Sequence, residues 1–461
     1  MKIKEISLDE AIAYCEKQES YLFDRKALRV QPRQLEKHAV AFANADGGEL
    51  VIGIADDGDE PSPSKRWNGA NDMEDFNSII QSLIHLSPSI DFKYKYLKCT
   101  ELDGLVLLLA IEKGNQVHKT SDNSVYVRFN ASSIQFKDPE KIQELAFAKG
   151  TSSYEDELVK TIPVERVVES KTIKNFLEQI TTESDSLEYV VNENLVDLIT
   201  FDPRVAGVLL FSDNPSPNLP RKCAVKIARY ETREDDPERD HLKDSYTLEG
   251  PLYNLIYDSV AKVTEIMSEI KMWTVDGLKT VEYPPEAIHE IITNAIIHRD
   301  YSISDDVQIQ IFNDRIEVLS PGRLPGYITV ENILDSRFSR NTKVVRTLHR
   351  YNKAPNKDMG EGLNTAFQKM KEWRLKSPEI IEERNFVRVI IPHTSLASPE
   401  QSVLDFLEKN EVIRNRQARE LTGIRSENTM KNVFYKLRDE GLIERVPFLE
   451  GPNSAWRKTK Q

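Results

Sequence analysis

Apolar positions along the chain follow strand-like runs in some segments and helix-like spacing in others, which predicts an α+β multidomain protein. A helical pattern covers Leu252–Met272, and a further helix is predicted after Pro284-Pro285. Alternating apolar and polar positions predict two strands joined by a turn at Asn313-Asp314. The predicted strands are Gly48–Ala55, Leu105–Ile111, Ser124–Phe129, Val205–Phe211, Cys223–Tyr230, Val307–Phe312 and Arg315–Ser320.

Changes in this pattern divide the chain into four segments. Residues 1–150 mix helices with apolar strands, whereas residues 151–201 are helical and charged, as is typical of a connector. Residues 202–394 return to strands and long helices. The small polar stretch His393–Gln401 predicts a linker to a C-terminal module at residues 398–461.

The C-terminal segment has the element order of a winged helix-turn-helix. Two helices, Gln401–Leu407 and Asn415–Thr422, precede a third that Ser426 caps. Two strands then turn around Gly451-Pro452. Between Ile413 and Arg438 there are seven basic residues and two acidic ones. This order resembles bacterial transcription regulators, so we expect either DNA binding or protein contacts. The candidate DNA contacts are Arg425, Asn428, Lys431, Asn432 and Lys436 in a major groove and Arg457 on the wing.

Overall charge limits how the chain can meet nucleic acid. The net charge of the 461 residues is −13, so any contact with a polyanion must be local. Three cysteines lie far apart in the sequence, and the N-terminus lacks the apolar core of a signal peptide, which favours a reducing cytoplasm. The longest apolar run, Leu105–Ile111, is too short to cross a membrane.

A polar stripe in the segment Glu290–Tyr301 gives the first functional hypothesis. Glu290, Asn294 and His298 recur every fourth residue, so they line one face of a helix beside apolar neighbours. A carboxylate, an amide and an imidazole could hold a metal-bound triphosphate. Further on, Gly360 and Gly362 precede a predicted helix, Asn364–Trp373, whose N-terminus could receive a phosphate. The alternative is a polar stripe on an ordinary amphipathic helix.

The ordered motifs from Asp202 to His393 resemble the ATP-binding domain of the GHKL group. They are most similar to the divergent version in bacterial predicted ATP-binding transcriptional regulators, some of which carry RecG-like labels. The matching pieces are Asn294–Ser302, Asp314–Pro325, Arg340-Asn341 and Gly360–Gly362. The resemblance implies a GHKL-like α/β sandwich that binds ATP and Mg²⁺.

The resemblance also implies roles for single residues. Glu290 matches the carboxylate that orients or deprotonates the attacking water, and Asn294 the amide that coordinates Mg²⁺. Gly360 and Gly362 match the glycines on the phosphate side, and Gly322 the first glycine of the adenine-side box. Ser320 stands where that box normally has the adenine-reading Asp, which favours nucleotide holding over turnover. The other candidate nucleotide-site residues are His298, Asp314, Arg340 and Asn341.

The N-terminal segment from Glu19 to Ser133 resembles the Schlafen-type AlbA-like domain, mainly through Ala41–Gly58. One interpretation is nucleic-acid binding by a basic helix face of Arg25, Lys26, Arg29, Arg33 and Lys37, with Arg128 nearby. Another is a nuclease in which Glu19, Asp24 and Asp56 hold Mg²⁺ or Mn²⁺ and Lys26 neutralises the scissile phosphate. The third is that these carboxylates form ion pairs and turn caps.

Three functional hypotheses follow. The first is an ATP-responsive DNA-binding regulator that forms homo-oligomers and consists of an AlbA-like α/β domain, a GHKL-like sandwich and a winged helix-turn-helix. The second is a metal-dependent, Schlafen-like nuclease gated by ATP, as in phage defence. The third is a protein-interaction scaffold with a degenerate nucleotide pocket.

Overall fold

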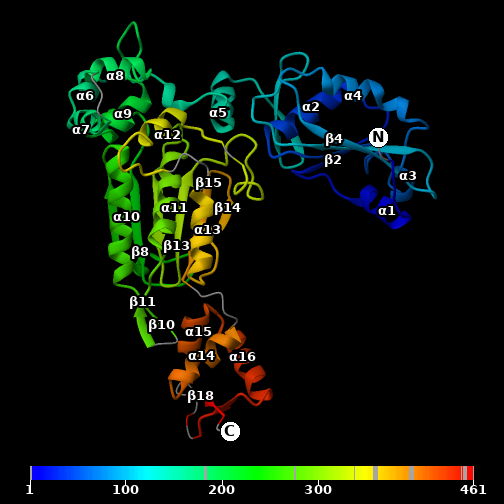
Figure 1. Ribbon diagram of the computed structural model, residues 1–461. Helices are drawn as coiled ribbons and strands as arrows, with labels where there is room; N and C mark the ends of the chain where they lie inside the picture. Colours follow the sequence, from blue (N-terminus) through cyan, green and yellow to red (C-terminus); the bar gives the residue numbers. More distant parts are fainter. Residues whose placement is uncertain are drawn as a thin grey trace. The chain divides into compact units, whose positions relative to one another are not determined.

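The computed structural model describes residues 3–180, 184–274, 277–336, 338–356, 362–393, 399–447, 449 and 454–459. The chain forms two compact units, shown in Figure 1. The N-terminal unit comprises residues 1–153 with 324–329, and the C-terminal unit comprises residues 154–323 with 330–461.

The N-terminal unit is built on a five-stranded mixed sheet of order β1-β4-β5-β3-β2. β1 pairs with β4 and β2 with β3 in parallel, whereas β5 is antiparallel to both of its neighbours. A separate hairpin, β6–β7, packs against α2. The strands are β1 (Ile3–Glu5), β2 (Phe23–Lys26), β3 (Gly48–Ile52), β4 (Phe92–Lys98), β5 (Leu105–Ile111), β6 (Val125–Phe129) and β7 (Ser132–Phe136). The helices are α1 (Leu8–Glu16), α2 (Pro32–Asn44), α3 (Pro63–Arg66), α4 (Asn77–Ile84) and α5 (Pro139–Lys149).

Helices cover both faces of this sheet, which explains the unbroken apolar run of β5. Leu107 and Leu109 belong to the core beneath α2 and α4, and Val106 and Leu108 belong to the core beneath α1. Figure 1 shows α2 and α4 on one side of the strands and α1 and α3 on the other. A strand buried on both faces needs apolar side chains at successive positions, because its residues alternate between the two faces.

The C-terminal unit contains a six-stranded sheet of order β14-β15-β13-β12-β8-β9, called the central sheet below. β12 pairs with β8 in parallel, and its other neighbour, β13, is antiparallel. Three helices, α10, α11 and α13, pack side by side (Figure 1). The strands are β8 (Val225–Tyr230), β9 (Leu242–Leu248), β12 (Val307–Ile311), β13 (Arg315–Pro321), β14 (Glu379–Glu382) and β15 (Phe386–Pro392). The helices are α10 (Leu252–Ser268), α11 (Pro285–Ile297), α12 (Thr342–Leu348) and α13 (Gly362–Glu372), and a small hairpin joins β10 (Lys271–Thr274) to β11 (Gly277–Thr280).

The segment predicted to be a connector shares the core of the central sheet. Its short helices are α6 (Glu165–Val168), α7 (Lys171–Ile180) and α8 (Ser186–Asn192). Val167 and Phe176 pack in the same cluster as Ile227 and Ile309 of the sheet.

One predicted strand is wrong. Val205–Phe211 forms helix α9, and all seven of its residues are buried. A short, continuously apolar run fits a buried helix as well as a buried strand, so periodicity cannot distinguish the two. The remaining strand predictions correspond to β3, β5, β6, β8, β12 and β13, with ends shifted by up to three residues.

The C-terminal module, residues 399–459, has its own small core. Helices α14 (Pro399–Lys409), α15 (Asn415–Thr422) and α16 (Glu427–Asp439) pack on a sheet of order β16-β18-β17. The strands are β16 (Ile413–Arg414), β17 (Ile443–Arg445) and β18 (Ala455–Lys458). Ser426 caps α16 by accepting a hydrogen bond from the Thr429 N–H, as its sequence position predicts. The predicted turn at Gly451-Pro452 lies outside the described residues.

Candidate functional site

The carboxylate and the amide of the predicted stripe meet on α11. This helix begins at Pro285, where the missing N–H of proline costs no intrahelical hydrogen bond. Asn294 donates from Nδ2 to Glu290 Oε1 over 2.8 Å, and both side chains are half-buried. The i, i+4 spacing on the helix therefore holds the two side chains together, and their polar atoms stay partly accessible to solvent.

His298 does not extend this stripe. The helix ends at Ile297, and His298 is the residue that follows it. Burial, together with the charge of Arg340, lowers the pKa of His298 to about 4. The imidazole is therefore neutral near pH 7 in this structure.

Gly362 brings the glycine motif to the same place. It is the first residue of α13, which packs against α11. A β-carbon at Gly362 would lie 1.7 Å from Oε1 of Glu290, so only glycine fits beside the carboxylate in its observed position. The start of α13, as far as the structure describes it, thus lies beside the Glu290–Asn294 pair. The other glycine of the motif, Gly360, lies outside the described residues.

The end of β13 packs against the last turn of α11. Ser320 donates its hydroxyl hydrogen to the carbonyl of Ala295 over 2.8 Å. Gly322 has φ of 105°, and a β-carbon there would lie 2.6 Å from Cβ of Asp300. Glycine is therefore required at this turn both by its backbone conformation and by the close approach of Asp300.

Arg340 and Asn341, predicted to bind nucleotide, are buried and brace α11 instead. Asn341 donates from Nδ2 to the carbonyls of Ile297 and Arg299, each over 2.9 Å. Arg340 donates to the Arg323 carbonyl over 2.8 Å and approaches Asp300 Oδ2 at 4.0 Å. The C-terminal carbonyls of a helix lack partners within the helix, and Asn341 satisfies that of Ile297, the last residue of α11.

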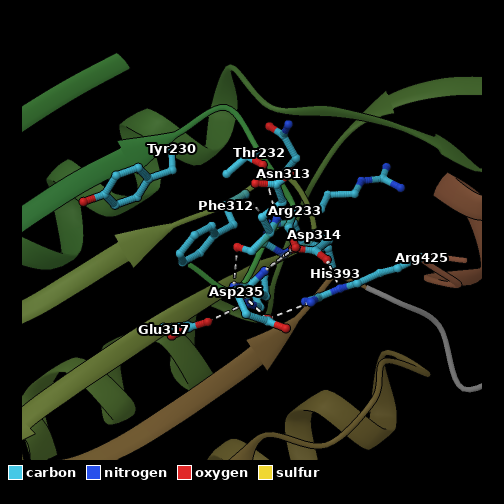
Figure 2. Close-up of polar contacts among 12 residues, drawn as sticks. Tyr230, Thr232, Arg233, Asp235, Phe312, Asn313, Asp314, Glu317, His393 and Arg425 are labelled. Carbon is cyan, nitrogen blue, oxygen red and sulfur yellow. Dashed lines mark hydrogen bonds and ion pairs between the residues drawn. The ribbon is translucent and has the colours of Figure 1, made fainter. Parts of the chain in front are cut away.

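Asp314 lies at the wrong end of β13 to share a site with Gly322. The strand runs from Arg315 to Pro321, so the two residues are separated by roughly 25 Å at the usual rise per strand residue. Asp314 instead pairs with Arg315 at 2.8 Å and with Arg425 at 3.1 Å. Figure 2 shows Asp314 beside Arg425. Its predicted role at the nucleotide is therefore not supported by its position.

A closed cluster of charges surrounds Asp24 in the N-terminal unit. Asp24 is fully buried on β2 and pairs with Lys26, with Arg128 at 2.6 Å and with His38 at 3.0 Å. Burial alone would raise the pKa of Asp24, but hydrogen bonding to His38 and the charge of Lys26 hold it well below its usual value. The sequence prediction missed His38, although its spacing from Leu35 and Phe42 places it on the inner face of α2.

The predicted metal trio is not formed. Both oxygens of Asp24 are engaged by cations or by His38, and Glu19 pairs with Lys26 at 2.8 Å. Asp56 is exposed beyond the end of β3. Across the described ranges of the chain, no group of three or more His, Cys, Asp or Glu side chains is arranged to hold a metal ion.

The predicted basic helix face is also wrong. Arg25 and Lys26 lie on β2, and Arg25 is buried against Asp57 and the Cys15 carbonyl. Arg128 is buried on Asp24 and therefore does not present its charge to solvent. Arg33 remains exposed on α2, and Arg29 is exposed but paired with Asp59 at 2.6 Å. A buried cation needs an anionic partner, and Arg25 and Arg128 have theirs in Asp57 and Asp24.

The C-terminal module keeps its predicted polar residues on the surface, with acidic neighbours. Asn428, Asn432 and Lys436 are exposed on α16, and Lys431 is partly exposed there. Their basic members pair within the module: Lys431 with Glu427 at 2.6 Å, Lys436 with Glu400 at 2.9 Å and, on the strands, Arg457 with Glu444 at 2.7 Å. Exposed pairs of this kind are weak and can be exchanged for phosphate contacts.

Two family models of known proteins match separate parts of the chain. A family model described as Schlafen, AlbA_2 matches residues 17–137, and one described as putative ATP-dependent DNA helicase RecG C-terminal matches residues 304–391. The chain carries a Schlafen AlbA_2-type domain and an ATPase-like domain. The AlbA_2-type match covers β2 to β7 and includes Asp24, and the ATPase-like match covers β12, β13 and the residues as far as β15.

Whole-chain comparisons add little. No curated protein matches the sequence. A crystal structure of a protein from Corynebacterium diphtheriae is similar at 18% identity over 98% of this chain and 96% of the other, with a TM-score of 0.41. Within the described residues, no helix is both long and apolar enough to cross a membrane.

Proposed function

We propose that the chain is an ATP-responsive, DNA-binding regulator. The observation that carries the proposal is the meeting of Glu290 and Asn294 with Gly362 at the start of α13. The match to an ATPase-related family over residues 304–391 supports nucleotide binding in the C-terminal unit. The match to the Schlafen AlbA_2 family supports a nucleic-acid partner.

The residues around Gly362 fit a magnesium-bound triphosphate. Side-chain oxygens of Glu290 and Asn294 are of the type that Mg²⁺ prefers, and the missing β-carbon of Gly362 lets the Glu290 carboxylate lie beside the first turn of α13, the kind of helix end where phosphates bind. When bound, the metal would neutralise phosphate charge. The Ser320 hydroxyl donates its hydrogen to the Ala295 carbonyl. Its oxygen can therefore only accept a hydrogen bond from the adenine of a nucleotide.

The nucleic-acid contacts in the proposal come from the ends of the chain. In the C-terminal module, Asn428 and Asn432 lie one helical turn apart on α16, and Lys431 and Lys436 flank them. Amide side chains suit base edges, and lysines suit phosphates. In the AlbA_2-type domain, the exposed Arg33 replaces the buried Arg25 and Arg128 as the candidate contact.

Nucleotide titration by calorimetry, with and without Mg²⁺, tests the first half of the proposal. We expect Asn294→Ala to raise the dissociation constant for Mg²⁺-ATP by about tenfold or more, because a metal ligand is lost; tenfold is about 1.4 kcal/mol. The matched control is Glu286→Ala, an exposed position in the first turn of the same helix. It should leave binding within about twofold.

Absence of ATP binding by the native protein, or equal binding by Asn294→Ala, would sink the nucleotide role. Phosphate release that Glu290→Gln abolishes would make the site an ATPase, and binding without release would leave it a sensor. We also propose that the chain forms homo-oligomers, and light scattering with and without ATP tests this self-association.

DNA affinity measured against salt tests the second half. Displacement of cations from DNA makes the logarithm of affinity fall linearly with the logarithm of salt concentration. We expect such a fall for the native chain and a shallower one for Lys431→Ala with Lys436→Ala. Affinity that does not depend on salt would argue that the C-terminal module makes protein contacts.

A further inference from the structure

One side chain of the C-terminal module is held by the central sheet. Arg425 lies just before Ser426, the cap of α16, and is half exposed. Its Nη1 donates to Asp235 over 2.6 Å, and its Nε donates to Asp314 over 3.1 Å. Figure 2 shows the guanidinium reaching both carboxylates, which come from the loop after β8 and from the turn between β12 and β13.

Asp235 and Asp314 are also held in place by contacts that do not involve Arg425. Arg315 is buried, stacks on Phe312 with 3.8 Å between the guanidinium carbon and the ring centroid, and pairs with Asp314 at 2.8 Å. It also donates to the carbonyls of Arg233 and Glu234, each over 3.2 Å. Because Arg315 contacts both the turn and the loop, Asp235 and Asp314 present a ready acceptor.

A second ion pair of opposite polarity accompanies the first. Arg233 of the loop approaches Glu420 of α15 at 3.8 Å, and α15 also contacts the β10 strand. The loop after β8 and the turn between β12 and β13 thus contribute both anions and a cation, and the C-terminal module contributes both an arginine and a glutamate. Contacts of both signs fix one orientation, since a rotated module would bring like charges together.

We propose that Asp235 and Asp314 form an acidic latch that occupies Arg425 until a phosphate of nucleic acid takes the arginine. The inference rests on nucleic-acid binding by the C-terminal module, as proposed above. A guanidinium has a fixed set of planar donors, and carboxylates and phosphates compete for the same ones. Closed, the latch lowers the apparent affinity for DNA, because binding must first release Arg425.

The exposure of these residues sets the strength of the latch. Side-chain exposure is 43% for Arg425 and 80% for Asp235, so solvent and salt weaken the pair. The hydrogen bond from Arg425 lowers the pKa of Asp235, which keeps the carboxylate charged. A weak, charged contact is one that a polyanion can open.

The test measures binding of a labelled mixed-sequence DNA duplex to the full chain by fluorescence anisotropy. The latch variant is Asp235→Asn with Asp314→Asn, which we expect to lower the dissociation constant by roughly threefold to tenfold. The control is Glu234→Gln with Asp236→Asn, which makes the same change in net charge at exposed positions of the same loop. The single variant Asp235→Asn, at the more exposed position, should show part of the gain and leave the midpoint of thermal unfolding within a few degrees of the native value.

The possible results separate the latch from the proposed function. Equal tightening by the latch variant and its control would show a general charge effect and overturn the latch. DNA binding by the native chain with an unchanged constant in both latch variants would overturn the latch and leave the proposed function standing. No DNA binding by any variant would overturn both.

Discussion

Two carboxylates predicted to be catalytic, Asp24 and Glu290, have opposite environments. Asp24 is fully buried among Lys26, His38 and Arg128. Glu290 is half-buried and its hydrogen-bond partners include the neutral amide of Asn294. A carboxylate that is already neutralised by cations in the core serves the fold, whereas one at the boundary of the core beside a helix N-terminus can serve a ligand.

Removing the charge of Asp24 should have the largest effect on stability. Asp24→Asn leaves Arg128 and Lys26 without their shared anion, and breaking a buried pair costs about 3–5 kcal/mol. The free energy of unfolding, from urea titration followed by circular dichroism, checks this value. Hydrogen exchange at the β2 and β3 amides locates the loss in the N-terminal unit.

Two matched variants make this prediction sharp. Asp56→Asn changes an exposed carboxylate of the predicted trio, and Glu290→Gln changes the other carboxylate of the comparison. Each should cost no more than about 1 kcal/mol. The contrast between the two environments would collapse if Asp24→Asn cost no more than these variants.

The second prediction concerns His393, a buried residue of the C-terminal unit whose protonation changes the free energy of unfolding. His393 is buried against Tyr283, and burial together with the charge of Arg229 lowers its pKa from 6.5 to about 3. The unfolded chain takes up this proton near pH 6.5, but the folded chain does so only near pH 3. The contribution of neutral His393 to the free energy of unfolding is therefore complete above pH 6.5. It falls by about 1.4 kcal/mol for each pH unit between about pH 6.5 and about pH 3.

The slope of unfolding free energy against pH measures this effect. His393→Gln should flatten the slope between pH 6.5 and 4, whereas His85→Gln, at an exposed position, should leave it unchanged. An identical slope in native protein and His393→Gln would show that the histidine contributes nothing to acid sensitivity.

A smaller effect comes from the backbone beside the candidate nucleotide site. Gly322→Ala puts a β-carbon 2.6 Å from Asp300 at a residue with φ of 105°, which should cost about 1–3 kcal/mol of unfolding free energy. Gly58→Ala is the control, because a β-carbon there meets no atom within 4 Å. Equal midpoints of thermal unfolding for the two variants would contradict the strain at Gly322.

The sequence predicted local features well because they depend on neighbouring residues. The pattern of α11, the Ser426 cap, the strand Leu105–Ile111 and the turn at Asn313-Asp314 all follow from short-range spacing and turn chemistry. It failed at Val205–Phe211, because a seven-residue apolar run has no period that separates a buried helix from a buried strand.

Only the tertiary structure decided which charges are available to a ligand. Arg128 is 104 residues from Asp24 in the sequence, and Gly362 is 72 residues from Glu290, yet each pair is in contact. The sequence by itself named Glu290, Asn294 and Gly362 as site residues from a motif, and it named Asp24, Arg25 and Arg128 in the same way. Burial separates the half-buried Glu290 and Asn294 from the buried Asp24, Arg25 and Arg128, because a charge removed from water must be neutralised inside the protein, and its partner comes from a distant part of the chain.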